Sequence, residues 1–378
     1  MRLHGILIAA GCLMAVPALA ADPIRIIGVL ELSGAGASVG TAYKNGLEMA
    51  VEEINGKGGV LGSRFEVKFY DTQTNPGIAR GQMQKALDEN PLVLVGPTYS
   101  GSVRAAMPIA QKAEIPEFTG GGAAQLTELG NPYIFRTLGS QRTSIPKVVN
   151  YLSETVHARK VGVIYANTDL GKGGRDVFLQ SAKEKGIEVV LDLSSEQGQA
   201  DFASDVLKLK SAALDAIFLS IHEEEVARFL KEGQRQGLKT PIFGEQTLLN
   251  PIVLQLAGDA GIGAKGYIPL TGDAPVSTLQ DLSSRFAVKF NYTPDHNGFQ
   301  GYIVGHVIKT VLKKIGKADP KLFAETLHGL TITAEEEPGV LLTTTWDKNG
   351  DINRAGFLAV VEKDNTLRVE KILPRTGE

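Results

Sequence analysis

The chain has 378 residues, of which 43% are hydrophobic and 21% are charged, and its formal net charge is −3. This composition is that of an ordinary globular protein and excludes intrinsic disorder and collagen-like structure. The length exceeds what one hydrophobic core usually supports, so we expect two lobes. The 39 basic and 42 acidic side chains balance, without a run of Lys or Arg, so nucleic acid is not an expected partner.

The first twenty residues have the pattern of a secretory signal peptide. Arg2 precedes an apolar stretch at 6–16, and Pro17 then precedes the small-x-small triplet Ala18-Leu19-Ala20. The apolar stretch is too short for a transmembrane helix, which needs about 18 apolar residues. We therefore predict cleavage after Ala20 and export across the cytoplasmic membrane. The only cysteine of the chain lies in this segment, so the mature protein forms no disulfide.

Short apolar, β-branched runs alternate with longer segments of helical periodicity, which is typical of parallel sheets flanked by helices. The first such array has predicted strands at 25–30, 65–70, 92–95 and 115–118 and predicted helices at 41–54, 77–88 and 102–113. A second array has predicted strands at 161–165, 188–193, 216–219 and 242–243 and predicted helices at 174–185, 202–209 and 223–236. A helix at 300–315 and strands at 340–346, 357–362 and 367–372 follow. The pattern predicts an α/β protein with two lobes, each a parallel sheet flanked by helices.

The loop after the first predicted strand matches two motifs of enzymes. Its glycines lie between a strand and a helix, as in dinucleotide-binding proteins, but their spacing is loose and Asp71 lies too far along the chain to hold a ribose. The run from Gly36 to Gly40 also matches the nucleophile elbow G-x-S-x-G of hydrolases. Its serine, Ser38, lies several residues beyond the predicted strand, whereas an elbow serine lies directly at the strand end. A secreted serine hydrolase that uses Ser38 is therefore the alternative function.

We expect neither a metal site nor a cofactor. The histidines of the mature chain are His157, His222, His296, His306 and His328. They show neither the H-x-x-x-H nor the H-E-x-x-H spacing of metal sites on helices.

Three glutamates, Glu223 to Glu225, open the predicted helix at 223–236. Acidic side chains in the first turn interact favourably with the helix dipole. We interpret these three residues as a solvated face of that helix.

Two loops that follow neighbouring strands have the composition of an anion site. The segment 96–102, GPTYSGS, brings hydroxyl groups to the start of a helix, where free N–H groups attract a carboxylate. A plain N-cap by Ser100 or Ser102 is the alternative for this segment alone. The segment 119–124, TGGGAA, places successive small residues whose backbone N–H groups can approach an anion closely. Together the two loops predict a pocket for an anionic group.

A series of short motifs runs in order through the mature chain. They are Leu32-Ser33-Gly34; Gly46 with Ala50, Ile54-Asn55 and Gly58-Gly59-Val60-Leu61-Gly62; Tyr70-Asp71 with Pro76; Val95-Gly96; Leu126-Thr127; Phe135-Arg136-Thr137; Gly237-Leu238-Lys239; and Trp346-Asp347 with Gly350-Asp351. In this order and behind a signal peptide, the chain resembles the periplasmic solute-binding proteins of the branched-chain amino acid (Leu/Ile/Val) type, which feed ABC importers.

The resemblance implies the type I periplasmic binding protein fold, with two lobes joined by three crossovers that close on a ligand without chemistry. It places lobe 1 at 22–141 plus 270–345 and lobe 2 at 142–269 plus 346–378. It implies a periplasmic monomer that binds a small carboxylate and delivers it to the permease subunits of an ABC transporter.

The resemblance also assigns binding residues one by one. The serine that binds the ligand carboxylate falls on Ser100, beside Thr98 and Tyr99. The small residues that assist it fall on Gly121, Gly122 and Ala123. On the second lobe, His222 and Gln246 take the places of the tyrosine and the glutamate that receive an α-ammonium group, and Glu245 precedes Gln246. Two tyrosines of the family pocket fall on Val39 and Leu170.

Two ligand classes stay open at this point. An ammonium group buried without acceptors costs several kcal/mol, so an amino acid ligand needs an acid such as Glu245 in the cleft. If Gln246 and His222 face the cleft instead, a carboxylate with a neutral polar or aromatic tail fits better. Adjacent residues of a strand point to opposite faces, so we expect only one of Glu245 and Gln246 to face the ligand.

Overall fold

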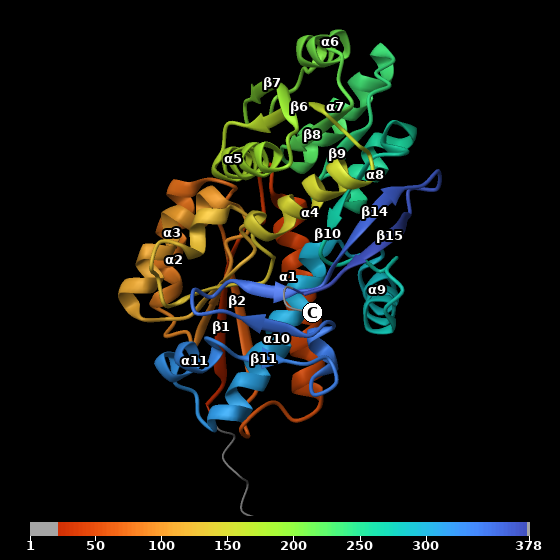
Figure 1. Cartoon of the computed structure of the whole chain (residues 1–378). Helices are drawn as coiled ribbons and strands as arrows, with labels where there is room; N and C mark the ends of the chain where they lie inside the picture. The colour runs from red at the N-terminus through yellow and green to blue at the C-terminus, as the bar shows by residue number, and fades with distance from the viewer. Residues whose placement is uncertain (1–21, 376–378) are drawn as a thin grey trace, which may run out of the picture.

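The computed structural model describes residues 22–375, which fold into two α/β lobes (Figure 1). The predicted signal peptide and its cleavage site lie outside the described residues. Within residues 22–375, no helix has both the length and the apolar character that a membrane crossing requires.

Lobe 1 is built on a five-stranded parallel sheet with the strand order β2-β1-β3-β4-β5. Its strands are β1 (Ile24–Leu30), β2 (Phe65–Asp71), β3 (Val93–Val95), β4 (Glu117–Thr119) and β5 (Ile134–Arg136). The helices before the first crossover are α1 (Ala37–Gly56), α2 (Pro76–Leu87) and α3 (Ser100–Ala113). Those that return later in the chain are α9 (Ser277–Phe290), α10 (His296–Ile315) and α11 (Pro320–Leu327).

The long helices α1 and α10 lie against each other in lobe 1 (Figure 1). Glycine permits the close approach, because a Cβ on Gly46 would lie 2.0 Å from the carbonyl oxygen of Gly298. A Cβ on Gly301 would lie 1.9 Å from the carbonyl oxygen of Tyr43. This pairing ties the start of α10 to lobe 1, near the end of the molecule that faces the second lobe.

Lobe 2 is built on a seven-stranded sheet with the order β15-β14-β10-β9-β8-β6-β7. Its strands are β6 (Lys160–Ala166), β7 (Glu188–Ser195), β8 (Ala216–Ser220), β9 (Ile242–Gly244), β10 (Lys265–Ile268), β14 (Gly356–Val361) and β15 (Leu367–Leu373). The strands from β6 to β10 pair in parallel, whereas β14 and β15 add an antiparallel hairpin at one edge. The helices are α4 (Gln141–Glu154), α5 (Asp169–Glu184), α6 (Ala203–Ser211), α7 (Glu223–Gln236) and α8 (Pro251–Ala257).

A small antiparallel sheet of β11 (Thr331–Ile332), β12 (Thr344–Trp346) and β13 (Ile352–Arg354) lies beside the crossovers. The buried Trp346 side chain donates a hydrogen bond from Nε1 to the carbonyl oxygen of Arg136, 3.0 Å away at the end of β5. The chain passes between the lobes three times, after β5, after β10 and after β13. The predicted two-lobe α/β fold with three crossovers is therefore confirmed, while the residue boundaries assigned to the lobes stay a prediction.

Candidate functional site

A small cavity, here called the cleft cavity, lies between the two lobes at the loops that follow their strands. Seven of the ten residues predicted for the site line it, namely Thr98, Tyr99, Ser100, Gly122, Leu170, His222 and Gln246. Val39 also lines it, so both positions assigned to family tyrosines are apolar walls. The free volume is about 30 Å³, close to that of one water molecule. The lobes are thus closed, and a ligand of amino acid size requires them to separate.

Ser100 is the first residue of α3 and is almost fully buried. Its Oγ accepts a hydrogen bond from the backbone N–H of Ala123 at 3.1 Å. Because this bond occupies a lone pair of the oxygen, the hydroxyl proton is left for an acceptor in the cavity. Neither Ser100 nor Ser102 caps the helix, since the N-cap residue is Tyr99 and makes no side-chain cap bond.

A buried carboxylate that the sequence did not reveal positions the loop before α3. Glu31, at the end of β1, accepts hydrogen bonds from the Thr98 hydroxyl, from the Thr98 N–H at 3.0 Å and from the Tyr99 N–H at 3.3 Å. Burial raises the pKa of Glu31, and these hydrogen bonds oppose the shift. Thr98 therefore holds the loop in place and has committed its hydroxyl proton to Glu31.

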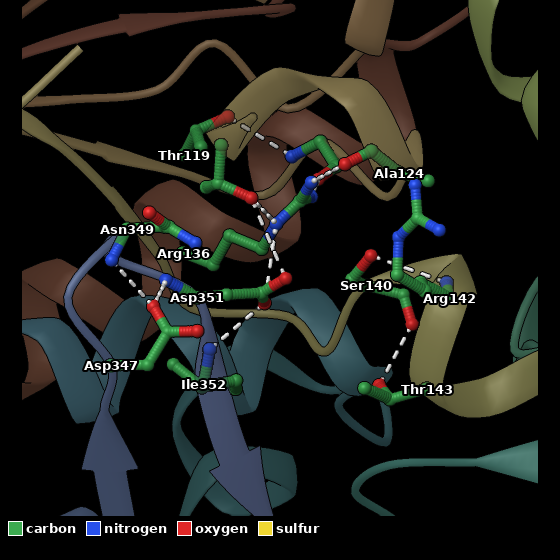
Figure 2. A network of polar contacts seen from close by, with 12 residues as sticks. Thr119, Ala124, Arg136, Ser140, Arg142, Thr143, Asp347, Asn349, Asp351 and Ile352 are labelled. Carbon is green, nitrogen blue, oxygen red and sulfur yellow. Dashed lines mark hydrogen bonds and ion pairs between the residues drawn. The ribbon is translucent and has the colours of Figure 1, made fainter. Parts of the chain in front are cut away.

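The second small-residue loop is held from behind by the buried guanidinium group of Arg136 (Figure 2). Arg136 donates to the carbonyl oxygen of Gly121 and, at 2.6 Å, to that of Ala123. The N–H groups of Gly121 and Ala123 bond to Thr119 and Ser100, so neither is available to a ligand in this conformation. Gly122 alone of the three lines the cavity, and among residues 22–375 nothing accepts a hydrogen bond from its N–H.

An aromatic contact joins the two lobes across the cleft cavity. The rings of Tyr99 and His222 are stacked with centroids 4.9 Å apart and an angle of 12° between their planes. His222 Nε2 also lies 3.2 Å from the Oγ1 of Thr168, the N-cap residue of α5. Burial lowers the pKa of His222, so its imidazole is neutral at pH 7. The stack occupies space that a ligand between the lobes would need.

The structure distinguishes the two neighbouring candidates on the second lobe. Glu245 is buried away from the cavity, where its carboxylate accepts from Gln141 Nε2 at 3.0 Å and from the Ser144 hydroxyl, both on α4. Burial raises the pKa of Glu245. Gln246 lines the cavity instead. This matches the expectation that only one of the two adjacent residues faces the cleft.

The interpretation of Glu223 to Glu225 as a solvated face is wrong for two of the three residues. Glu223 is 8% exposed and Glu225 is 2% exposed, whereas Glu224 lies at the surface beside Arg228. The sequence did contain a signal, because Glu223 shares a helix face with the apolar residues three, four and seven positions later, all of them buried. All three glutamates lie in the first turn of α7, and the helix face on which each one lies decides whether it is buried.

Glu223 brings an unsatisfied carboxyl oxygen to the cleft cavity. It lines the cavity beside His222 and Gln246, and its Oε2 has no hydrogen-bond partner within the described chain. Burial, reinforced by the nearby negative charges of Asp295 and Glu225, raises the pKa of Glu223 to about 8. A cationic group placed in the cavity would satisfy this oxygen and restore the charged form.

The start of α10 completes the cavity wall with His296 and Asn297. Its N-cap residue, Asp295, accepts from the N–H groups of Asn297 and Gly298 and from Asn250 Nδ2 at 2.9 Å. Asn250 is itself the N-cap of α8 in lobe 2, so this pair of caps links the lobes beside the cavity. The start of α10 was not predicted, because the expected helix began only at 300, and Asn250 was not predicted because no helix was expected at 251–257.

Ser38, the nucleophile of the alternative hydrolase, is the second residue of α1. The preceding strand β1 ends at Leu30, so Ser38 lies in the helix, well beyond the strand end. Its position lacks the strained strand-to-helix turn that exposes the serine of a nucleophile elbow.

Two α/β lobes that close on a buried cavity, with a hydroxyl group and a helix N-terminus on one wall, define a hinged solute-binding protein. The family model "Periplasmic binding protein" matches residues 23–366. The chain therefore belongs to the periplasmic binding protein family. Its curated relatives are binding proteins and give no support to a serine hydrolase.

Curated relatives cover nearly the whole chain at low identity. The "Leucine-, isoleucine-, valine-, threonine-, and alanine-binding protein" of Pseudomonas aeruginosa is 26% identical over 356 residues, which are 93% of each protein. The Leu/Ile/Val-binding protein of Escherichia coli is 25% identical over 370 residues, 94% of this chain and 96% of the relative.

Solved structures share the fold. A branched-chain amino acid transporter substrate-binding protein from Streptococcus pneumoniae, in complex with isoleucine, superposes with a TM-score of 0.83 at 23% identity, covering 93% of this chain and 99% of that one. A solute-binding protein of an ABC transporter from R. palustris, in complex with benzoate, gives a TM-score of 0.85 at 20% identity, covering 94% and 98%. The same fold thus accommodates an amino acid in one relative and an aromatic acid in another.

Proposed function

We propose that this protein is the periplasmic substrate-binding component of an ABC transporter and that it captures a small carboxylate between its lobes for delivery to the permease. Membership of the family and the names of the relatives support the transport role. The polar groups that line the closed cavity support capture of a small polar ligand. We propose that it works as a monomer after removal of the first twenty residues.

The carboxylate end of the ligand binds at the lobe 1 wall in this proposal. The Ser100 hydroxyl has a proton to donate, because its oxygen already accepts from Ala123. The Gly122 N–H lines the same cavity without a partner among the described residues. Ser100 is the first residue of α3, where the helix dipole favours a negative charge, and Gly122 lies in the loop after β4.

The ammonium end decides the ligand class, and Glu223 is the observation that carries the choice. Gln246 and His222 are neutral, so they alone would suit an acid with an uncharged tail. Glu223 adds to the same wall a buried carboxyl whose Oε2 has no partner among the described residues. An ammonium group beside it would favour its charged form, because an opposite charge close by offsets the cost of burial. We therefore propose an amino acid, whose carboxylate faces Ser100 and whose ammonium group faces Glu223.

A thermal-shift panel on residues 21–378 tests the proposal. The panel holds branched-chain and polar amino acids, aromatic acids, short dicarboxylates and amides. A ligand at 100 times its Kd adds about 2.7 kcal/mol of stability, which is roughly 5–10 °C in Tm for lobes of this size. We expect the largest shift with an amino acid. A shift only with acids that lack an amine would overturn the role of Glu223 and leave capture of a carboxylate intact, whereas turnover of any compound would contradict a binding protein.

A further inference from the structure

A second pocket, here called the hinge pocket, lies where segments of all three crossovers meet. It is lined by Gly139 and Arg142 after β5, by Tyr267 at the end of β10, and before β14 by Asp347, Asn349 and residues 351–354. Its volume is about 340 Å³, and no residue that lines it also lines the cleft cavity. Figure 2 shows the polar groups on one side of it. A molecule bound here would touch the three segments that must bend when the lobes move.

Arg354, the last residue of β13, brings a buried cation without a counter-ion to this pocket. Its side chain is 6% exposed, and within the described chain no carboxylate forms an ion pair with it. Nη2 donates to the carbonyl oxygen of Thr137 at 2.9 Å, while Nε has no hydrogen-bond partner among residues 22–375. Burial lowers the pKa of Arg354 to about 10, which expresses the cost of an isolated charge at this position.

Lys147, on α4, is a second cation without a carboxylate partner among residues 22–375. Its Nζ lies 5.7 Å from the ring centroid of Tyr267 and 3.4 Å from the carbonyl oxygen of Pro374. Burial lowers its pKa as well. Arg354 stabilises the ionised form of the same tyrosine, and both cations line the pocket together with Tyr267.

The carboxylates that line the pocket have other partners. Glu128 pairs with Arg142, and Asp351 lies 3.3 Å from the guanidinium group of Arg136. Asp347 is exposed and accepts backbone N–H groups of its own turn, from Asn349 at 2.8 Å. Among residues 22–375, neither Lys147 nor Arg354 therefore forms an ion pair with a carboxylate that lines the pocket.

We propose that the hinge pocket binds a small oxyanion, a carboxylate or a phosphate, through Lys147 and Arg354, which line it together with Tyr267. A guanidinium group and an ammonium group are the donors that proteins use for such anions. An anion that links the three crossovers changes the equilibrium between open and closed lobes. Because coupling between two sites is reciprocal, it also changes the affinity of the cleft for its ligand.

Titration calorimetry on the mature protein with inorganic phosphate and with acetate, in chloride buffer of matched ionic strength, tests the site. We expect saturable one-to-one binding of at least one of the two anions. The anion with the lower Kd shows whether the pocket prefers a phosphate or a carboxylate. Lys147→Gln removes one charge-assisted hydrogen bond and should weaken binding about tenfold or more. Arg354→Lys keeps the charge but loses the planar fork, and it should weaken binding without unfolding the protein. Lys172→Gln, on the surface of α5, changes the net charge equally and should have no effect.

Two further measurements separate the hinge pocket from the cleft. Ser100→Ala should leave phosphate binding unchanged, because Ser100 does not line the hinge pocket. Saturating anion should change the Kd of the best ligand from the thermal-shift panel by about fivefold or more, and Lys147→Gln should abolish this change. The absence of saturable binding, equal weakening by Lys172→Gln, or binding that leaves the cleft affinity unchanged would each overturn the proposal.

Discussion

The two walls of the cleft cavity differ in how their polar groups are satisfied. On the lobe 1 wall, most donors and acceptors already bond to each other, as Thr98 does to Glu31 and Ala123 to Ser100. On the lobe 2 wall, Glu223 has an unpartnered oxygen. A wall whose polar groups are hydrogen-bonded to each other is rigid, and it fixes the position of the group that all ligands share. A wall with unsatisfied groups selects among ligands, because only a matching ligand satisfies them.

Replacing Arg136 should have the largest effect, a loss of folding stability, because this residue holds the small-residue loop of the lobe 1 wall. Arg136→Met withdraws the donors that hold the Gly121 and Ala123 carbonyl oxygens and leaves Asp351 without its cation. Breaking a buried ion pair costs about 3–5 kcal/mol, so urea unfolding should show a loss of that size. Arg142→Met, which breaks only the exposed pair with Glu128, should cost about 1 kcal/mol or less. Equal losses in the two variants would contradict the role of Arg136.

Glu223→Gln should have the next largest effect, on ligand affinity alone. Truncating one partner of a buried charge pair costs about 2–5 kcal/mol, which calorimetry would detect as a large rise in the Kd of an amino acid ligand. The matched control is Glu224→Gln, because Glu224 lies at the surface one residue away. Unchanged affinity in Glu223→Gln would show that Glu223 does not bind the ammonium group.

Ser100→Ala should weaken binding by about 1–3 kcal/mol through the loss of one charge-assisted hydrogen bond. Ser102→Ala, in the same turn of α3, is the control, since Ser102 does not line the cleft cavity. Calorimetry with the same ligand compares the two variants. Wild-type affinity in Ser100→Ala would remove the carboxylate from its proposed position.

The raised pKa of Glu223 also predicts a dependence of stability on pH and a release of protons on binding. A carboxyl whose pKa rises from 4.5 to about 8 on folding holds a proton that the unfolded chain releases, so its contribution to stability is present below pH 4.5 and is lost as the pH rises toward 8. Between these values, stability without ligand should fall with pH, and less steeply in Glu223→Gln. Binding of an ammonium group at pH 7 should release up to one proton, which calorimetry in two buffers of different ionisation enthalpy measures.

The architecture could be predicted from the sequence because periodicity and strand-end loops are local properties. The helix at 141–154 was missed although Ile145, Val148, Val149 and Leu152 follow helical spacing, because Pro146 interrupts the pattern. The start of α10 was missed because its capping residue, Asp295, follows Pro294, and its first turn is polar.

The site could be predicted only in part. The resemblance led to Ser100, His222 and Gln246, which the structure brings to one cavity. Glu31 and Glu223 were not found, because their importance comes from burial between segments distant in sequence. Glu245 and Gln246 lie in the turn after β9, which ends at Gly244, so the choice between them depends on how that turn meets α4 and not on strand alternation.

Trp346 is the only tryptophan of the chain, and it lies beside the third crossover with its indole bonded to the backbone at the end of β5. The natural protein therefore carries one tryptophan fluorophore, placed at the hinge itself. Its emission spectrum and its accessibility to quenchers report on the bending region without a label. Stopped-flow fluorescence on the unmodified protein could thus follow the rate of lobe closure separately from ligand occupancy.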